Sequence, residues 1–190
     1  MSAWPWYVSR AAGLVAWFLL TVGVVDGLLL SMKRLRKPSV AWHTDLHRMF
    51  AACGVMLVGV HVTSLLFDQY VTFTPTEMLV PGAAHWRPVA IAFGVVAMYL
   101  LVAVELTSLA RNSLPARVWH GTHLLALAVF VGGSVHAYMA GADTRAPLAL
   151  ATCFGAFVAV GLLVGARFSR DLAPRRNVVA APPRGDFQNF

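Results

Sequence analysis

The chain alternates between long apolar runs and short polar segments. The first run covers 11–30 and contains a single charged residue, Asp26. The second begins near Trp42 and carries no formal charge from 49 to 67. The remaining runs cover about 88–110, 118–142 and 146–166. A helix needs about 20 apolar residues to cross a bilayer, so the pattern predicts an all-α integral membrane bundle of five transmembrane helices.

The polar segments divide the chain around these spans. Residues 1–10 form a predicted outer N-terminal segment, 11–166 the transmembrane domain and 167–190 a cytoplasmic tail whose Arg, Pro and Asn content is typical of disorder. The segment 68–87 is rich in Thr, Pro and Gly and is long enough to hold a short surface helix around 76–80. The first run is longer than a signal-peptide core and no cleavage site is evident, so we expect it to be retained.

Composition agrees with a membrane protein. Of the 190 residues, 58% are hydrophobic and only 12% are charged, about half the charge of an ordinary soluble domain, and the mean hydropathy is +0.68. The net charge of +7 raises the question of nucleic-acid binding. Its distribution instead obeys the positive-inside rule, so no nucleic-acid partner is expected. Cys53 and Cys153 lie inside apolar runs, where we expect buried small residues.

The basic residues orient the five spans. With the C-terminus inside, 12 of the 15 Lys and Arg residues are cytoplasmic, while Arg10, Arg87 and Arg145 lie outside. Aromatic residues suited to the interfaces occur at both faces: Trp4, Trp6 and Tyr7 at one, Trp42 and Trp119 at the other. The sequence therefore predicts an N-out, C-in protein of the cell (inner or plasma) membrane.

Four histidines inside the spans carry the candidate chemistry, because histidine is rare in a bilayer and is a functional hypothesis by default. Thirteen residues separate His47 from His61 in the second span, and twelve separate His123 from His136 in the fourth. Both spans run from inside to outside, so His47 matches His123 in depth and His61 matches His136. The two levels are about 20 Å apart at about 1.5 Å per residue. Facing imidazoles at one depth suit the two axial positions of a haem iron.

Helical phase is a stricter test of this reading. Fourteen steps of about 100° return His61 to within about 40° of His47, but thirteen steps leave His136 about 140° from His123. An ideal straight helix would not bring the second pair to one partner. Local unwinding at Gly132 and Gly133 would relieve the mismatch.

The histidine segments resemble the ferric-reductase-like transmembrane domain family, shared by ferric reductases, NADPH oxidases and the haem subunit of bacterial methionine sulfoxide reductase. The resemblance covers about 42–142, and 67–70 and 85–88 look like small actinobacterial members without a flavin domain. It rests on these segments: Leu46-His47-Arg48, Val60-His61-Val62, Trp119-His120-Gly121-Thr122-His123 and Val135-His136-Ala137. It implies a haem-binding four-helix core with two haems b, an inner haem on His47 and His123 and an outer haem on His61 and His136.

The resemblance implies a transmembrane cytochrome b, an electron-transfer subunit that needs partners. Family reductases carry FAD and NADPH domains after the last span, whereas 24 residues follow Ala166 here. We therefore expect a separate cytoplasmic flavoprotein reductase, or quinol, as the donor. An extracytoplasmic protein or a ferric chelate is the expected acceptor. Many family members have six spans, and this sequence predicts five.

Other polar residues have two readings each. His120 is a second candidate ligand of the inner haem or a haem-propionate contact near the interface. His43 fits an interfacial polar residue, and His85 either a solvated loop residue or a contact to propionate or acceptor. Arg48, Arg117 and Arg87 either pair with propionates or only obey the positive-inside rule.

Two acidic residues lie within spans. Asp26 and Glu105 must face protein or an interface, either in structural pairing with Arg or a helix end, or in proton uptake or quinol binding near the inner haem. Gly54, Gly59, Gly132 and Gly133 allow close helix approach or a flat macrocycle against the backbone. The competing hypothesis is a haem-free structural or accessory subunit whose histidines form hydrogen bonds between helices.

Overall fold

The computed structural model describes residues 4–32, 39–141 and 146–171, which are almost entirely helical. The helices are α1 (Trp4–Ser31), α2 (Ser39–Leu65), α3 (Pro75–Leu79), α4 (Pro88–Leu109), the 3₁₀ helix η1 (Arg111–Ser113), α5 (Ala116–Leu124), α6 (Ala126–Ala140) and α7 (Pro147–Asp171). Within a bilayer the helix satisfies every backbone polar group inside its own segment. The long apolar runs therefore fold as helices, which confirms the all-α fold class.

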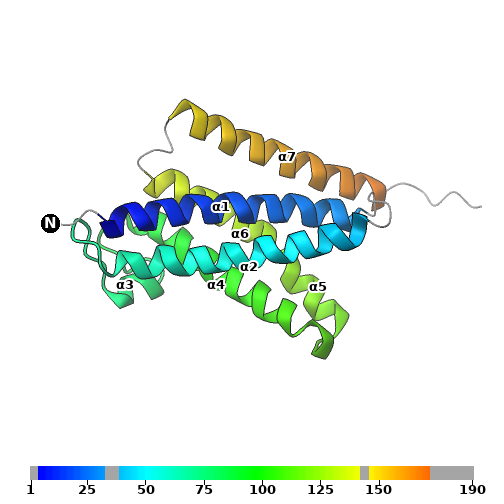
Figure 1. The fold of residues 1–190 in the computed structure, drawn as a ribbon, viewed down its shortest axis with the longest axis horizontal. Coiled ribbons are helices and arrows are strands. Elements are labelled where there is room, and N and C mark those ends of the chain that lie inside the picture. The colour runs from blue at the N-terminus through cyan, green and yellow to red at the C-terminus, as the bar shows by residue number, and fades with distance from the viewer. Residues whose placement is uncertain (1–3, 33–38, 142–145, 172–190) are drawn as a thin grey trace, which may run out of the picture.

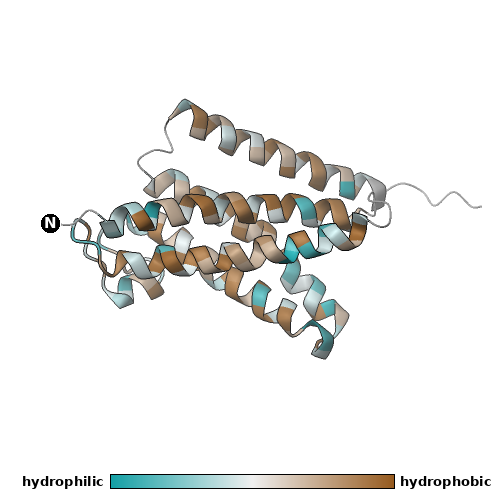
Figure 2. Ribbon diagram, viewed as in Figure 1, coloured by the Kyte–Doolittle hydropathy of each residue, from teal (hydrophilic) through white to brown (hydrophobic). Residues whose placement is uncertain are grey.

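Five spans in the described chain are long and apolar enough to cross a membrane: Trp4–Ser31, Ser39–Leu65, Pro88–Leu109, Ala116–Ala140 and Pro147–Ser169. The protein is thus a multi-pass membrane protein. Figure 2 shows hydrophobic residues along these helices and hydrophilic ones gathered near helix ends and around α5. The first span begins earlier than predicted, and the last continues five residues into the predicted tail. The basic cluster 33–37, Arg145 and 172–190 lie outside the described residues.

The bundle consists of two helix pairs that face each other. α1 packs along α2, and α4 packs along α6, with far fewer contacts between α2 and α4. α7 lies at the side of α1 (Figure 1). The bundle has two ends (Figure 1). The end that holds α3 and the start of α1 is called the α3 end, and the end that holds α5 and the start of α2 is called the α5 end.

The fourth span is interrupted between His123 and His136, the two residues whose helical phase does not match in a straight helix. α5 ends at Leu124 and α6 begins at Ala126, and the amide of Leu125 donates to the Thr122 carbonyl oxygen at 3.0 Å, three residues back. This tighter turn changes the phase between His123 and His136. The break does not fall at Gly132 and Gly133, where the sequence would have permitted it, because both lie within the regular helix α6.

The segment 66–87, which contains α3, packs against the first turns of α4. Pro75 begins α3 at a position where no amide donor is needed, and Thr74 and Glu77 form a reciprocal capping box. The short helix therefore lies within one residue of its predicted position. Phe73 and Trp86 pack on Ile91 and Val95 of α4, and the Tyr99 hydroxyl donates to the Leu79 carbonyl oxygen at 2.5 Å. The segment is thus fixed to the top of α4.

The packed core is small because the space between the helix pairs is open. Leu28, Phe130 and Val160 join α1, α6 and α7 in one cluster. Among its described residues α2 buries only Gly54, although it is 27 residues long. One side of α2 faces the membrane and another faces a cavity.

Candidate haem-binding site

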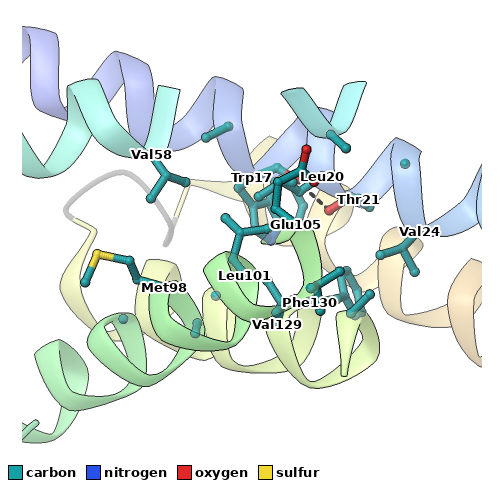
Figure 3. Close-up of a pocket in the computed structure, with 18 of the residues that line it drawn as sticks. Trp17, Leu20, Thr21, Val24, Val58, Met98, Leu101, Glu105, Val129 and Phe130 are labelled. Carbon is teal, nitrogen blue, oxygen red and sulfur yellow. Dashed lines mark hydrogen bonds between the residues drawn. The ribbon is translucent and has the colours of Figure 1, made fainter. Parts of the chain in front are cut away.

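A cavity of about 1390 Å³ separates the two helix pairs, and all four candidate histidines line it. Figure 3 shows its middle, where Trp17 and Leu20 of α1 lie opposite Leu101 of α4 and Phe130 of α6. Its lining is predominantly apolar. A site for one drug-sized ligand occupies about 300–1,000 Å³, so this cavity has room for more than one such group.

The structure brings the histidines together in the two pairs that depth matching predicts. The ring centres of His47 and His123 are 5.9 Å apart and the ring planes make an angle of 61°. The ring centres of His61 and His136 are 6.1 Å apart, with an angle of 76°. His47 and His61 come from α2, His123 from α5 and His136 from α6. Each pair therefore spans the cavity from one helix pair to the other.

These separations fit a metal ion held between two imidazoles. A histidine nitrogen binds a transition metal at about 2 Å and lies about 1 Å from its ring centre, so two axial imidazoles have ring centres about 6 Å apart. Both observed separations are close to that value. The described residues contain no group of three or more His, Cys, Asp or Glu side chains that could hold a metal. The pairs suit a cofactor that supplies the other ligands itself.

Backbone carbonyl groups of neighbouring helices hold three of the four rings. Nδ1–H of His47 donates to the Gly23 carbonyl oxygen at 2.9 Å, that of His61 to Ser9 at 2.8 Å and that of His136 to Ala90 at 2.8 Å. A carbonyl accepts only, so the proton of each neutral ring lies on Nδ1 and Nε2 keeps its lone pair. This is the tautomer and the outer hydrogen bond that metal-binding histidines use.

The fourth ring is held differently. Nδ1 of His123 lies 3.4 Å from the Ser108 hydroxyl, and the Trp119 ring stacks on it with centres 5.1 Å apart and planes 23° apart. The guanidinium group of Arg111 lies 4.5 Å from the Trp119 ring centre on α5. Stacking and a polar contact thus orient His123 at the end of the broken helix.

Glycines on neighbouring helices make room for the same three rings. A Cβ atom added to Gly13 would lie 2.9 Å from Nδ1 of His61, one added to Gly27 would lie 3.0 Å from Cε1 of His47, and one added to Gly94 would lie 2.6 Å from Nδ1 of His136. Sequence reasoning missed all three glycines. A signal was present for two of them, because Gly13 and Gly27 are 14 residues apart, the same spacing as His47 and His61.

The glycines that the sequence analysis named have different surroundings. A Cβ at Gly54 would lie 2.7 Å from Cδ2 of Leu20, which indicates close approach of α1 and α2. Gly59 has nothing within 4 Å of such an atom. Gly133 lines the cavity with open space before it, and Gly132 faces Ala97 at 3.4 Å. Gly54 is therefore a packing glycine, and Gly133 leaves the cavity wall flat.

The other candidates lie at the cavity ends. His120 lines the α5 end, but its Nδ1–H donates to Ala116 of its own helix at 2.7 Å. Arg48 also lines that end, together with Arg111 and Arg167, which sequence reasoning missed. Arg10 and Arg87 line the α3 end. Arg117 is exposed and is not among the lining residues.

Two histidines lie within hydrogen-bond distance of carboxylates. Asp26 pairs with His43 at 2.5 Å, so its partner is neither an arginine nor a helix end. His85 pairs with Glu77, and its amide donates to the same carboxylate at 2.9 Å. Hydrogen bonds from the Thr74 amide and from His85 lower the pKa of Glu77 from 4.5 to about 2. His85 is thus a structural partner of α3. Glu105 lines the middle of the cavity and is half-buried (Figure 3).

Comparison with family models, with curated proteins and with solved structures finds no match to this chain. The functional argument therefore rests on the geometry of the site.

Proposed function

We propose that this protein is a transmembrane b-type cytochrome that carries electrons across the cell membrane through two haems. The observation that carries the proposal is the pair of facing imidazoles at each of two levels of one apolar cavity. His47 and His123 hold the inner group, and His61 and His136 hold the outer one. The proposal includes the relationship to ferric-reductase-like transmembrane domains that the histidine segments suggest.

Haem iron with histidine on both sides supplies one-electron transfer and keeps no open coordination position. The chain's own residues do the rest. The Nδ1–H bonds of His47, His61 and His136 keep each Nε2 unprotonated and fix the ring direction. Apolar walls keep water away, and arginines at both cavity ends supply positive charge for carboxylate side groups of the cofactor.

The spacing of the two pairs suits transfer between them. His61 follows His47 by fourteen residue steps along α2, about 21 Å along the helix axis at about 1.5 Å per residue. Under the orientation that the basic residues favour, the α5 end faces the cytoplasm and the α3 end faces outward. Electrons enter at the α5 end from a flavoprotein or quinol and leave at the α3 end to an outer protein or ferric chelate.

A haem-free structural subunit is the second candidate, favoured by the interhelical hydrogen bonds of His47, His61 and His136. Those bonds use Nδ1 only. They leave unexplained why a second ring faces each histidine about 6 Å away across a large cavity.

A reduced-minus-oxidised visible spectrum of the detergent-purified protein tests the proposal, with haem measured against protein as the pyridine haemochrome. We expect two low-spin b-type haems per chain. The His61→Ala and His136→Ala variants should each retain one, while His85→Ala, which alters a histidine outside the cavity, should retain two. A colourless protein after expression with ample haem would favour the structural subunit. Two haems in His61→Ala would overturn the outer site.

A further inference from the structure

Asp26 is a buried carboxylate in the membrane-spanning helix α1 whose hydrogen bonding is incomplete. The residue is only 5% exposed. Oδ1 accepts a hydrogen bond from Nδ1 of His43 at 2.5 Å, while Oδ2 is buried with no hydrogen-bond partner among the described residues. A carboxylate in an apolar setting is costly unless it is fully paired. Helix packing alone would be better served by an apolar residue here.

The pair lies beside the proposed inner haem site. His43 precedes His47 by one turn of α2. Asp26 lies between Gly23, whose carbonyl oxygen accepts from His47, and Gly27, whose Cα lies against the His47 ring. The same two helices thus position the acid pair and the histidine ligand.

Access to the pair is from the membrane side. Neither Asp26 nor His43 is among the residues that line the cavity. The His43 side chain is 23% exposed, and the neighbouring Trp42, which is 62% exposed, lies edge-on to its ring at 4.9 Å. Both residues are in the first turns of α2, near the membrane interface. A lipid-phase molecule at the α5 end can therefore reach His43 without entering the cavity.

Among the described side chains, the other charged groups of the neighbouring helices are exposed or line the cavity. On the described parts of α1, α2 and α7, Asp45 is exposed, while Arg48 and Arg167 line the cavity. In the described chain, the Asp26 carboxylate accepts a side-chain hydrogen bond from His43 alone. The Asp26 carboxylate therefore contacts a single imidazole, that of His43, through Nδ1. The other ring nitrogen, Nε2, points away from the carboxylate.

We propose that Asp26 and His43 form a quinol-oxidation site, which would make a lipid-soluble quinol the electron donor; this rests on the proposed cytochrome function. The quinol hydroxyl binds at Nε2 of His43, which accepts its proton, and the Asp26 carboxylate stabilises the imidazolium that forms. One quinol releases two protons in succession to the cytoplasmic side. Its two electrons reduce two ferric haems by one electron each, and a quinone leaves.

A lipid-phase donor explains the combination of features better than a flavoprotein does. Quinols are apolar, reside in the bilayer and release one proton with each electron. That chemistry requires a proton acceptor, and His43 supplies one a single helical turn from the proposed haem ligand His47. A flavoprotein that delivers electrons from the cytoplasm needs no proton acceptor within the membrane.

Stopped-flow reduction by 2,3-dimethyl-1,4-naphthoquinol tests the site on the purified two-haem protein. Asp26→Asn keeps the shape and one hydrogen-bond acceptor but not the charge. We expect it to slow quinol-driven haem reduction by roughly 100-fold, the scale of general-base effects, and to leave haem content and dithionite reduction unchanged. Asp45→Asn, which alters an exposed acid on the same helix, should behave as wild type.

A binding measurement on the wild-type chain needs no haem. The oxidised naphthoquinone should protect His43, but not His85, from modification by diethyl pyrocarbonate, read by mass spectrometry. Quinol reduction of Asp26→Asn at the wild-type rate, or unprotected His43, would overturn the site. A wild-type protein with two haems that quinol does not reduce would overturn the site and leave the cytochrome proposal standing. Absence of haem would instead defeat the cytochrome proposal.

Discussion

At the scale of single residues, three glycines lie so close to the histidine rings that an added Cβ would press against them. Gly94 is the tightest of these, since a Cβ there would lie 2.6 Å from Nδ1 of His136. That nitrogen is also bound to the Ala90 carbonyl oxygen on the same helix α4. The ring therefore has no room to move aside without losing its hydrogen bond.

Replacement of Gly94 by alanine should expel the outer haem. The added methyl group displaces the His136 ring, at a cost of about 1–3 kcal/mol for overpacking, and turns it from its partner. We expect the haem content to fall from two per chain to one, measured as pyridine haemochrome. Gly59→Ala is the matched control, because nothing lies within 4 Å of its added carbon. A Gly94→Ala protein with two haems would show that haem binding does not depend on the close contact between Gly94 and the His136 ring.

His120 and His123 are three residues apart, and the structure distinguishes them. His123 faces His47, whereas the Nδ1–H of His120 is bound within its own helix. We expect His123→Ala to lose the inner haem and His120→Ala to keep both, as judged by redox titration of the visible spectrum. Haem loss in the His120 variant with retention in the His123 variant would reassign the inner ligand.

At the scale of elements, α3 depends on the ionised Glu77 carboxylate. The pKa of Glu77 is lowered by hydrogen bonds from Thr74 and His85, so ionised Glu77 stabilises the folded loop at pH values above 4.5. That contribution is lost as the pH falls from 4.5 through about 2.

Pepsin cleavage within 66–87 should follow the same titration. Wild type should resist cleavage at pH 4.5 and become susceptible toward pH 2, whereas Glu77→Gln should be susceptible at both values. Asp45→Asn, an exposed change on α2, should resemble wild type. Equal resistance of wild type and Glu77→Gln at pH 4.5 would mean that the capping box does not hold the loop.

Much of the element structure could be predicted from sequence because a bilayer imposes a simple rule on length and polarity. The spans and α3 follow from apolar runs and from the Thr74-Pro75 start of a capping box. The break at Leu125 could not be predicted, because no Gly or Pro marks it. The sequence did not predict the contact between Asp26 and His43. Hydrophobic periodicity indicates which face of a helix is apolar, but it does not indicate which neighbouring helix that face contacts.

At the scale of the whole molecule, an open cavity replaces most of the packed core. Haem should therefore stabilise the bundle by mass action, by about 4 kcal/mol when free haem is at 1,000 times its dissociation constant. We expect the haem-depleted protein to unfold at a lower temperature in the same detergent, followed by circular dichroism. Equal melting temperatures of the haem-loaded and haem-depleted proteins would mean that haem does not stabilise the helix bundle.

The division into two helix pairs has a consequence for how the protein is made. α1 with α2, and α4 with α5 and α6, are each contiguous in sequence and leave the ribosome as self-contained hairpins. Each hairpin presents one histidine at each level, so neither can retain a haem alone. Under the proposed function, cofactor insertion would therefore come last in biogenesis and join halves already in the membrane. Two polypeptides divided within 66–87 and synthesised together would still assemble around it.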